Sequence, residues 1–212
     1  MQEKYLTIKN QVEKTIVIER SKFICKIKSV DTEEQAKEFV NEIKALHPFA
    51  THNCYAYHIS TPELKQKFSD DGEPQGTAGL PMLEALKNKG LTNVCAVVTR
   101  YFGGIKLGAG GLVRAYSSSV SETITSDNII AYEKCLILSF SVEYDGYSKI
   151  LSIAQDSNVS IVKTEFNDKI DIKVAISKPF YNKFVEILAD VFKGKISHEV
   201  LGEDFFSTGE KN

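Results

Sequence analysis

The last third of the sequence switches repeatedly between strand and helix periodicity, in an order that fits few folds. Residues 136–144 (LILSFSVEY) alternate apolar and polar side chains, as a half-exposed strand does. The expected elements are, in order, a strand at 136–144, a helix at 147–156, strands at 158–165 and 170–176, a helix from Pro179 to Gly194, and a strand at 196–201. This β-α-β-β-α-β order predicts a split β-α-β, or ferredoxin-like, domain.

The first two thirds predict a larger mixture of strands and helices. Asp31 or Thr32 can cap a helix, and His47-Pro48 ends it, because a residue before proline disfavours helical backbone. The expected elements are strands at 15–19 and 21–30, a helix at 31–46, a strand at 53–59, a polar loop at 60–79, a helix at 81–89, a strand at 93–101, a glycine loop at 102–111 and a helix at 112–126. The fold class is therefore α+β.

The change of pattern near Cys135 divides the 212 residues into two expected domains, 1–136 and 137–206, with a tail at 207–212. No apolar run approaches the ~18 residues that a membrane span needs. The first residues, MQEKYLTIKN, lack the apolar core of a secretory signal. We therefore expect a cytoplasmic protein without a membrane segment, whose four cysteines are reduced and mostly buried.

Glycine is concentrated in the middle of the chain, where nine of the 13 glycines fall between residues 72 and 111. Two segments, 69–79 (SDDGEPQGTAG) and 100–116 (RYFGGIKLGAGGLVRAY), hold eight of these nine. Because glycine permits close approach of backbone to a ligand, the two segments suggest a paired surface. Gly110-Gly111 before a helix would point backbone N–H groups outward, as phosphate-binding turns do. The same residues also suit a tight turn without a ligand.

Charge is distributed unevenly along the chain. The net charge of −2 excludes a protein that binds nucleic acid through bulk positive charge. However, Arg100 and Arg114, two of only three arginines, flank the second glycine segment, Lys106 lies within it, and residues 85–121 contain no acid. Arginine suits bidentate phosphate contacts. The sequence therefore predicts a small basic, glycine-rich face.

Three carboxylates, those of Asp70, Asp71 and Glu73, lie in the first glycine segment. Acids in loops commonly form turn bonds to the backbone, so we interpret them as loop architecture or a salt bridge to Arg100 or Arg114. A partner contact and a metal site are the alternatives, although the segment lacks the 12-residue calcium-loop pattern.

A zinc site and a catalytic site find little support in the sequence. His52, Cys54 and His58 would share one strand face, but His58 lies ~13 Å beyond Cys54, too far for joint coordination. No serine occupies a nucleophile elbow, and no histidine–carboxylate pair lies near a nucleophile. We assign no catalytic residue and expect no metal or cofactor.

The segments DDGEPQGTAGLPMLEAL (residues 70–86) and VVTRYFGGIKLGAGGLVRAYSSSV (residues 97–120) resemble the signature of the YigZ/IMPACT family. The R-Y-F-G-G-x-x-L-G motif is specific, and the resemblance extends over nearly the whole chain. Gln75 and Leu80 differ from the usual family pattern, which weakens a phosphate contact by the first segment. The resemblance implies an N-terminal domain similar to domain four of elongation factor G and to several ribosomal proteins. It implies a C-terminal domain similar to domain five of that factor.

The resemblance implies a link to translation, which eukaryotic relatives control through a protein partner, but no settled reaction. We therefore expect a non-enzymatic protein that contacts RNA or the ribosome through the second glycine segment. Tyr101 and Phe102 would stack on unpaired bases if exposed, and the competing placement buries both rings. The expected phosphate-contacting residues are Arg100, Lys106 and Arg114, with the backbone of Gly103, Gly104, Gly108, Gly110 and Gly111.

Two other classes of function stay open. The glycine loop that opens a helix also resembles that of GHMP small-molecule kinases, although the proline-led, serine-rich kinase pattern is missing. In such an enzyme Asp70, Asp71 or Glu73 would bind magnesium or act as the base. A protein-interaction module would instead use the acidic loop and the second domain, since residues 138–212 carry a net charge of −3.

Overall fold

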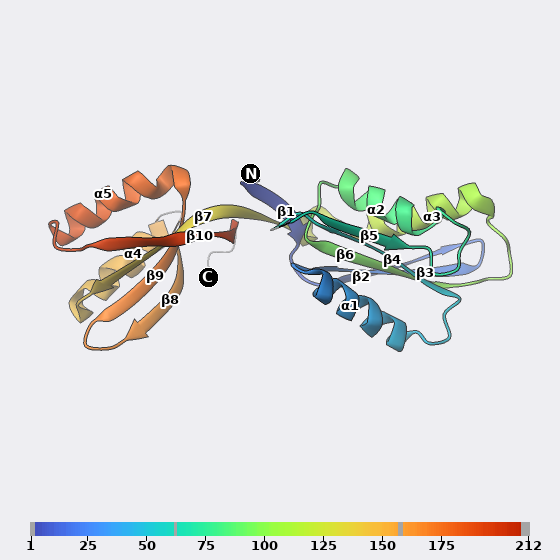
Figure 1. Cartoon of the computed structure of the whole chain (residues 1–212), viewed down its shortest axis with the longest axis horizontal. Coiled ribbons are helices and arrows are strands. Elements are labelled where there is room, and N and C mark those ends of the chain that lie inside the picture. The colour runs from blue at the N-terminus through green and yellow to red at the C-terminus, as the bar shows by residue number, and fades with distance from the viewer. Residues whose placement is uncertain (1–2, 62, 157–158, 209–212) are drawn as a thin grey trace. The chain divides into compact units, whose positions relative to one another are not determined.

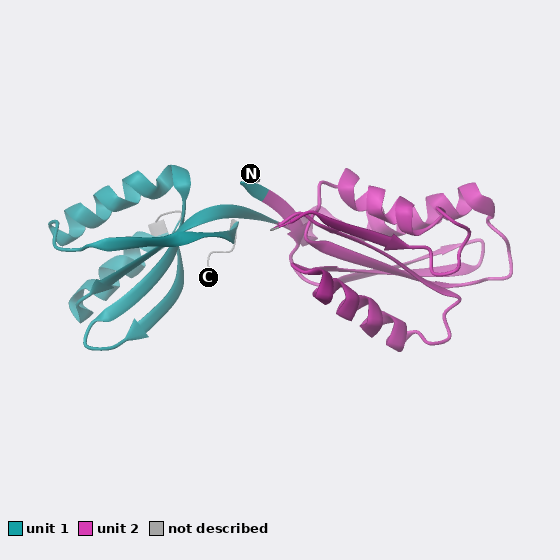
Figure 2. Ribbon diagram, viewed as in Figure 1, with its two compact units in different colours: residues 1–4, 131–212 teal, residues 5–130 magenta. Residues whose placement is uncertain are grey.

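The chain folds into a mixed α/β structure with two five-stranded sheets. The computed structural model describes residues 3–61, 63–156 and 159–208. The chain divides into a larger unit, residues 5–130, and a smaller unit, residues 1–4 and 131–212 (Figure 2). It passes from one unit to the other inside the strands β1 (Lys4–Ile8) and β7 (Ile129–Val142). This division lies six residues before the boundary at residue 136 that the sequence suggests.

The larger unit contains a sheet with the strand order β2-β3-β6-β4-β5, in which every neighbouring pair is antiparallel. Its strands are β2 (Val12–Ile18), β3 (Ser21–Ser29), β4 (His52–Ile59), β5 (Lys65–Ser69) and β6 (Val94–Tyr101). Its helices are α1 (Glu33–Leu46), α2 (Gly79–Asn88) and α3 (Gly108–Thr123), and a short 3-10 turn, η1 (Ser126–Asn128), precedes β7. The central strand β6 is buried along almost its whole length because helices cover both faces.

Helix α1 covers one face of this sheet, whereas α2 and α3 cover the other (Figure 1). The Thr32 side chain accepts a hydrogen bond from the Gln35 N–H and caps α1. One stripe of α1 then packs on the sheet through Phe39 and Ile43. The opposite core contains Phe23 from β3 and Tyr116 from α3, whose rings meet edge to face with centroids 5.3 Å apart.

The smaller unit follows the order β7-α4-β8-β9-α5-β10. Its sheet has the strand order β1-β7-β9-β8, and β10 pairs with β7. The elements after β7 are α4 (Tyr147–Asp156), β8 (Val159–Phe166), β9 (Ile170–Ser177), α5 (Tyr181–Phe192) and β10 (His198–Thr208), with 3-10 turns at η2 (Tyr144–Gly146) and η3 (Lys178–Phe180). Phe184 and Leu188 of α5 pack in its core.

Several sequence expectations require correction. Strand β7 begins at Ile129 rather than at residue 136. Strand β5 lies inside the segment 60–79 that we expected to be a loop, because an exposed edge strand needs no apolar face. Helix α3 begins at Gly108 rather than residue 112. Strand β10 continues to Thr208, past the expected end at residue 201 and into the expected tail, whose residues 209–212 lie outside the described part. Strand β1 was not expected.

The described residues, 3–61, 63–156 and 159–208, include no helix that is both long and apolar enough to span a membrane.

Candidate functional site

The two glycine-rich segments meet through one buried ion pair. Arg100, at the end of β6, donates from Nη1 to Glu73 Oε1 over 2.7 Å, and Tyr116 of α3 donates its O–H to the same oxygen over 2.7 Å. Arg100 and Glu73 are only 5% and 7% exposed. Burial above all raises the pKa of Tyr116, which keeps this phenol protonated and able to donate. The first segment is therefore anchored to β6 and α3.

This placement corrects the prediction that Arg100 contacts phosphate. Besides its bond to Glu73, the guanidinium donates from Nη2 to Ser21 Oγ over 3.3 Å. Its central carbon lies 5.3 Å from the ring centroid of Phe23 and 5.5 Å from that of Phe102. A guanidinium that is buried, paired with a carboxylate and close to two aromatic rings is not available to an anion in solution, so we interpret Arg100 as a structural residue.

The other two acids of the first segment also take protein partners. Asp70 accepts hydrogen bonds from the backbone N–H groups of Gly76, Ala78 and Gly79, which lie at the start of α2. Asp71 accepts from Lys44 Nζ and from the Asn53 N–H, both at 2.7 Å. The bonds from Ala78 and Gly79 to Asp70 satisfy donors at the start of α2 that would otherwise lack partners, and the bonds to Asp71 tie the loop to α1 and β4. The carboxylates therefore fix the loop and the first turn of α2.

The histidine and cysteine side chains of β4 each form a hydrogen bond to a different backbone carbonyl. His52 pairs with the Asp71 carbonyl at 2.8 Å, His58 with the Leu91 carbonyl at 2.9 Å, and Cys54 Sγ donates to the Asp70 carbonyl at 2.9 Å. Within the described ranges, which omit residues 1–2, 62, 157–158 and 209–212, no three His, Cys, Asp or Glu side chains gather as a metal site.

All four cysteines are unpaired and buried. Burial raises the pKa of the Cys25 thiol to about 12 and that of Cys135 to about 11. Burial also raises the pKa values of Cys54 and Cys95 well above the ordinary thiol value. Because the thiolate is the nucleophilic form, these thiols are poorly suited to covalent catalysis near neutral pH.

The second glycine segment is exposed where it leads into α3. Gly104 and Gly108 have φ angles of +86° and +68°, which side chains rarely adopt. Leu107, the N-cap residue of α3, makes no capping hydrogen bond through its side chain, and the first turn of this helix carries no acid. The first backbone N–H groups of a helix have no partner within the helix, and they form its positive end. This exposed start of α3 can therefore accept an anion.

Several loops of the larger unit lie at the same end of the sheet as this segment (Figure 1). The Phe102 N–H donates to Thr51 Oγ1 over 3.0 Å, and the Gly103 N–H donates to Ser21 Oγ over 3.1 Å. We call this end the loop face, defined as residues 19–22, 46–51, 102–111 and 114. Its cations Lys106 and Arg114 are exposed, as a binding role requires.

Arg20 is a further candidate that the sequence did not single out. It lies in the turn between β2 and β3, and its side chain is exposed. Its backbone lies so close to Gly103 that a Cβ at position 103 would overlap the Arg20 carbonyl group. Neither motif nor spacing revealed this proximity, although Arg20 is the third of the three arginines.

The two aromatic residues that follow β6 have different environments. Tyr101 is half-buried, and its O–H lies 3.0 Å from His47 Nδ1. Phe102 is 46% exposed. Of the two rings expected to stack or to be buried, Phe102 is thus the accessible one.

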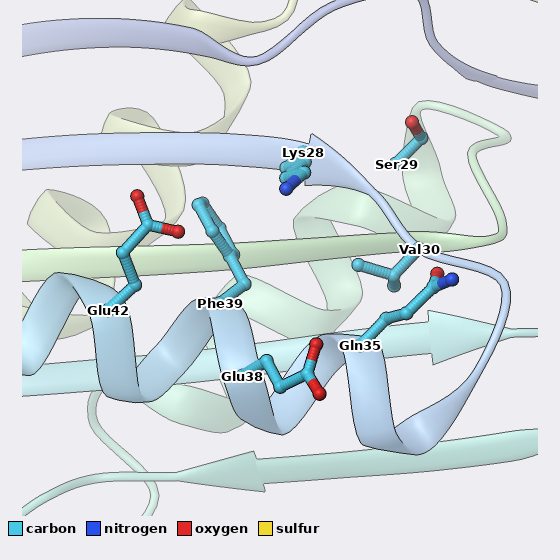
Figure 3. Close-up of a pocket in the computed structure, with 7 residues that line it drawn as sticks. All are labelled: Lys28, Ser29, Val30, Gln35, Glu38, Phe39 and Glu42. Atoms are coloured by element: carbon cyan, nitrogen blue, oxygen red, sulfur yellow. The ribbon is translucent and has the colours of Figure 1, made fainter.

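A separate hollow of about 300 Å³ lies beside α1 (Figure 3). It is lined by Lys28, Ser29, Val30, Gln35, Glu38, Phe39 and Glu42. Its one cation, Lys28, lies 5.8 Å from the Phe39 ring centroid, and two carboxylates from α1 share the lining. Such a lining is unsuited to an anion, so the hollow is distinct in chemistry from the loop face.

Both glycine-rich segments lie within the part of the chain that matches a known protein family. The family described as the Impact N-terminal domain matches residues 19–124. IMPACT family member YvyE of Bacillus subtilis (strain 168) is 44% identical over 191 residues, which cover 90% of this chain and 88% of that protein. IMPACT family member YigZ of Escherichia coli (strain K12) is 35% identical over 183 residues, which cover 84% and 89%.

A solved structure described as the crystal structure of a hypothetical protein is also similar. It is 32% identical, covers 96% of this chain and all of its own, and superposes with a TM-score of 0.63. The family match includes the loop face from residue 19 to Arg114, and the relatives extend over both units. This chain belongs to the IMPACT family.

Proposed function

We propose that this protein binds RNA, free or within the ribosome, through the loop face. The observation that carries the proposal is the uncapped, glycine-rich start of α3 between the exposed cations Lys106 and Arg114. The stretch of residues 85–121 contains no acid to compete with a bound anion. Backbone N–H groups and cations together favour phosphate oxygens.

The spacing of the cations favours a polymer over a single phosphate. Arg114 lies six residues after Gly108, or about 9 Å along the axis of α3. Arg20 approaches from a different element, beside Gly103. Cations on separate elements suit the successive phosphates of a nucleic-acid chain. Glu19, next to Arg20 in the sequence, is an exposed acid of the same turn. The family resemblance implies a domain similar to those of ribosomal proteins and a link to translation, and both favour RNA as the ligand.

The domain types remain predictions. We propose that the larger unit is the domain similar to domain four of elongation factor G, and that the smaller unit is ferredoxin-like. In support, the smaller unit has the element order β-α-β-β-α-β. Fold similarity alone does not carry function, so the RNA proposal rests on the loop face rather than on the domain types.

The geometry favours neither alternative function. A small-molecule kinase would need Asp70, Asp71 or Glu73 for magnesium or for base catalysis, and each of these carboxylates is engaged by protein donors. A protein-interaction module that binds its partner through the acidic loop meets the same difficulty, because donors of the protein itself already occupy those carboxylates.

A salt titration tests the proposal. We expect the affinity of the full chain for a fluorescent RNA hairpin with a single-stranded tail to fall steeply between 50 and 200 mM KCl. The double substitution Lys106→Ala/Arg114→Ala should weaken binding and reduce the slope of log K against log salt by about 2, one for each cation removed. Fluorescence anisotropy measures both quantities.

The matched control removes two exposed lysines of β5 in the same unit, Lys65→Ala/Lys67→Ala, so that the net charge changes equally. This control should keep the wild-type slope. An RNA affinity that does not change with salt, or an equal loss of affinity in both double variants, would refute the loop face as the RNA site.

A further inference from the structure

Two phenylalanines are exposed on the loop face. Phe49, in the loop between α1 and β4, is 91% exposed, and Phe102 is 46% exposed. A phenylalanine in water forgoes the favourable free energy of burial, and the aliphatic residues three positions from each in the sequence, Leu46 and Ile105, are exposed as well. Grouped apolar exposure of this kind marks a surface that contacts a ligand or partner.

Backbone bonds place the two phenylalanines at neighbouring points. The Ala50 N–H donates to the His47 carbonyl over 3.1 Å and closes a turn that carries Phe49. Two residues later, Thr51 donates its N–H to the Arg100 carbonyl over 2.8 Å and accepts from the Phe102 N–H over 3.0 Å. Because two residues span at most ~7 Å, Phe49 lies within reach of the segment that carries Phe102.

The Phe102 ring is supported from within the protein. The Arg100 guanidinium carbon lies 5.5 Å from its centroid, and the ion pair with Glu73 holds that guanidinium in place. The ring is therefore positioned before any ligand arrives, which reduces the ordering that binding must impose. Arg100, which does not meet the ligand, acts here as a positioning residue.

Exposed cations lie near Phe102 on the neighbouring strand, on the adjacent turn and further along its own loop. Lys22 pairs in register with Tyr101, immediately before Phe102, and its side chain is exposed. Arg20 adjoins Gly103, and Lys106 follows Ile105. Exposed aromatic rings flanked by cations are the recurring surface of proteins that bind single-stranded nucleic acid, since cations track the phosphates while bases stack on the rings.

We propose that Phe49 and Phe102 stack on unpaired bases, so that the ligand of the loop face is single-stranded RNA. This inference rests on the proposed function. A duplex keeps its bases stacked and offers no ring face to a phenylalanine, whereas a single strand can unstack its bases onto aromatic side chains. The positive charges near Phe102 complement the phosphates of a nucleic acid, whereas a peptide with few acidic residues would leave them unpaired.

The test compares a 12-nucleotide RNA strand with the blunt 12-base-pair duplex of the same sequence, by anisotropy with the full chain. We expect the single strand to bind about tenfold more tightly. Phe49→Ala and Phe102→Ala should each weaken single-strand binding about tenfold and leave its salt slope unchanged. Phe→Tyr at either position should keep the affinity, and Phe→Leu should lose it, because leucine keeps apolar surface but has no ring.

Phe166→Ala is the matched control, because Phe166 is a 60% exposed phenylalanine of β8 in the smaller unit. It should bind like the wild type. Equal binding of strand and duplex, with unchanged Phe49 and Phe102 variants but a weakened Lys106→Ala/Arg114→Ala variant, would overturn this inference and keep the proposed function. Binding of neither RNA at low salt would overturn both. Wild-type RNA affinity in the Phe→Ala variants, together with loss of binding to anionic phosphatidylglycerol vesicles, would assign the rings to a membrane instead.

Discussion

Replacing Arg100 by alanine should lower the free energy of unfolding by about 3–5 kcal/mol, as removal of one partner of a buried ion pair does. The change leaves the Glu73 carboxylate buried with only Tyr116 to donate to Oε1. It also removes the hydrogen bond to Ser21 and the packing on Phe23 and Phe102. Urea unfolding followed by circular dichroism measures the change through the transition midpoint.

Arg114→Ala is the matched control, since it removes the same side chain from an exposed position of α3. Its effect on the free energy of unfolding should stay within about 0.5 kcal/mol. Tyr116→Phe, which removes one donor to Glu73, should lie between the two at about 1 kcal/mol. If Arg100→Ala costs no more than Arg114→Ala, the ion pair does not anchor the first glycine segment.

Gly103→Ala should destabilise the fold by about 3 kcal/mol, the upper part of the usual range for overpacking. A Cβ at this position would overlap the backbone carbonyl of Arg20 and the backbone nitrogen of Ser21. Neither obstacle is a flexible side-chain end, so the turn between β2 and β3 has to move. That turn already holds Glu19 and Arg20 at φ angles of +45° and +63°, which limits how far it can adjust.

The control for this prediction is Gly110→Ala in the first turn of α3. A Cβ there meets nothing within 4 Å, and its φ is not in the left-handed region. Alanine at a compatible position should raise the free energy of unfolding by about 0.4–1 kcal/mol. Equal stability of the two variants, measured by urea unfolding, would contradict the close approach of β6–α3 backbone to the β2–β3 turn.

The sequence predicts well those helices and strands that are marked by short-range features such as caps, helix stops and apolar periodicity. Helix α1 (Glu33–Leu46) follows from the cap at Thr32, a stripe of apolar residues and a stop before Pro48, all of them short-range features. The order of elements after residue 130 followed from periodicity in the same way. Strand β5 was not predicted, because the largely polar and exposed sequence KQKFS has no apolar face to mark it, and its order comes from pairing with the neighbouring strand β4.

The candidate site was predicted only in part, because an arginine can pair with a bound phosphate or with a carboxylate of the protein itself. A guanidinium that suits phosphate equally suits a buried carboxylate, so the position of Arg100 beside the glycine segment gave no means to distinguish them. Its exposure depends on Glu73, 27 positions away in the sequence. The roles proposed for Arg20 and Phe49 depend on long-range contacts with β6 and its following loop, which no local pattern encodes.

The most direct test of the RNA-binding loop face is amide chemical-shift mapping of the full ¹⁵N-labelled chain titrated with the 12-nucleotide RNA strand. We predict the largest shifts at the amides of the exposed α3 start and of the loop before it, including Gly104, Gly108 and Gly110, with smaller changes around Phe49. The described amides of the smaller unit, within residues 131–156 and 159–208, should change little. The largest shifts in the smaller unit, with the amides of Gly104 to Gly110 unmoved, would contradict the account.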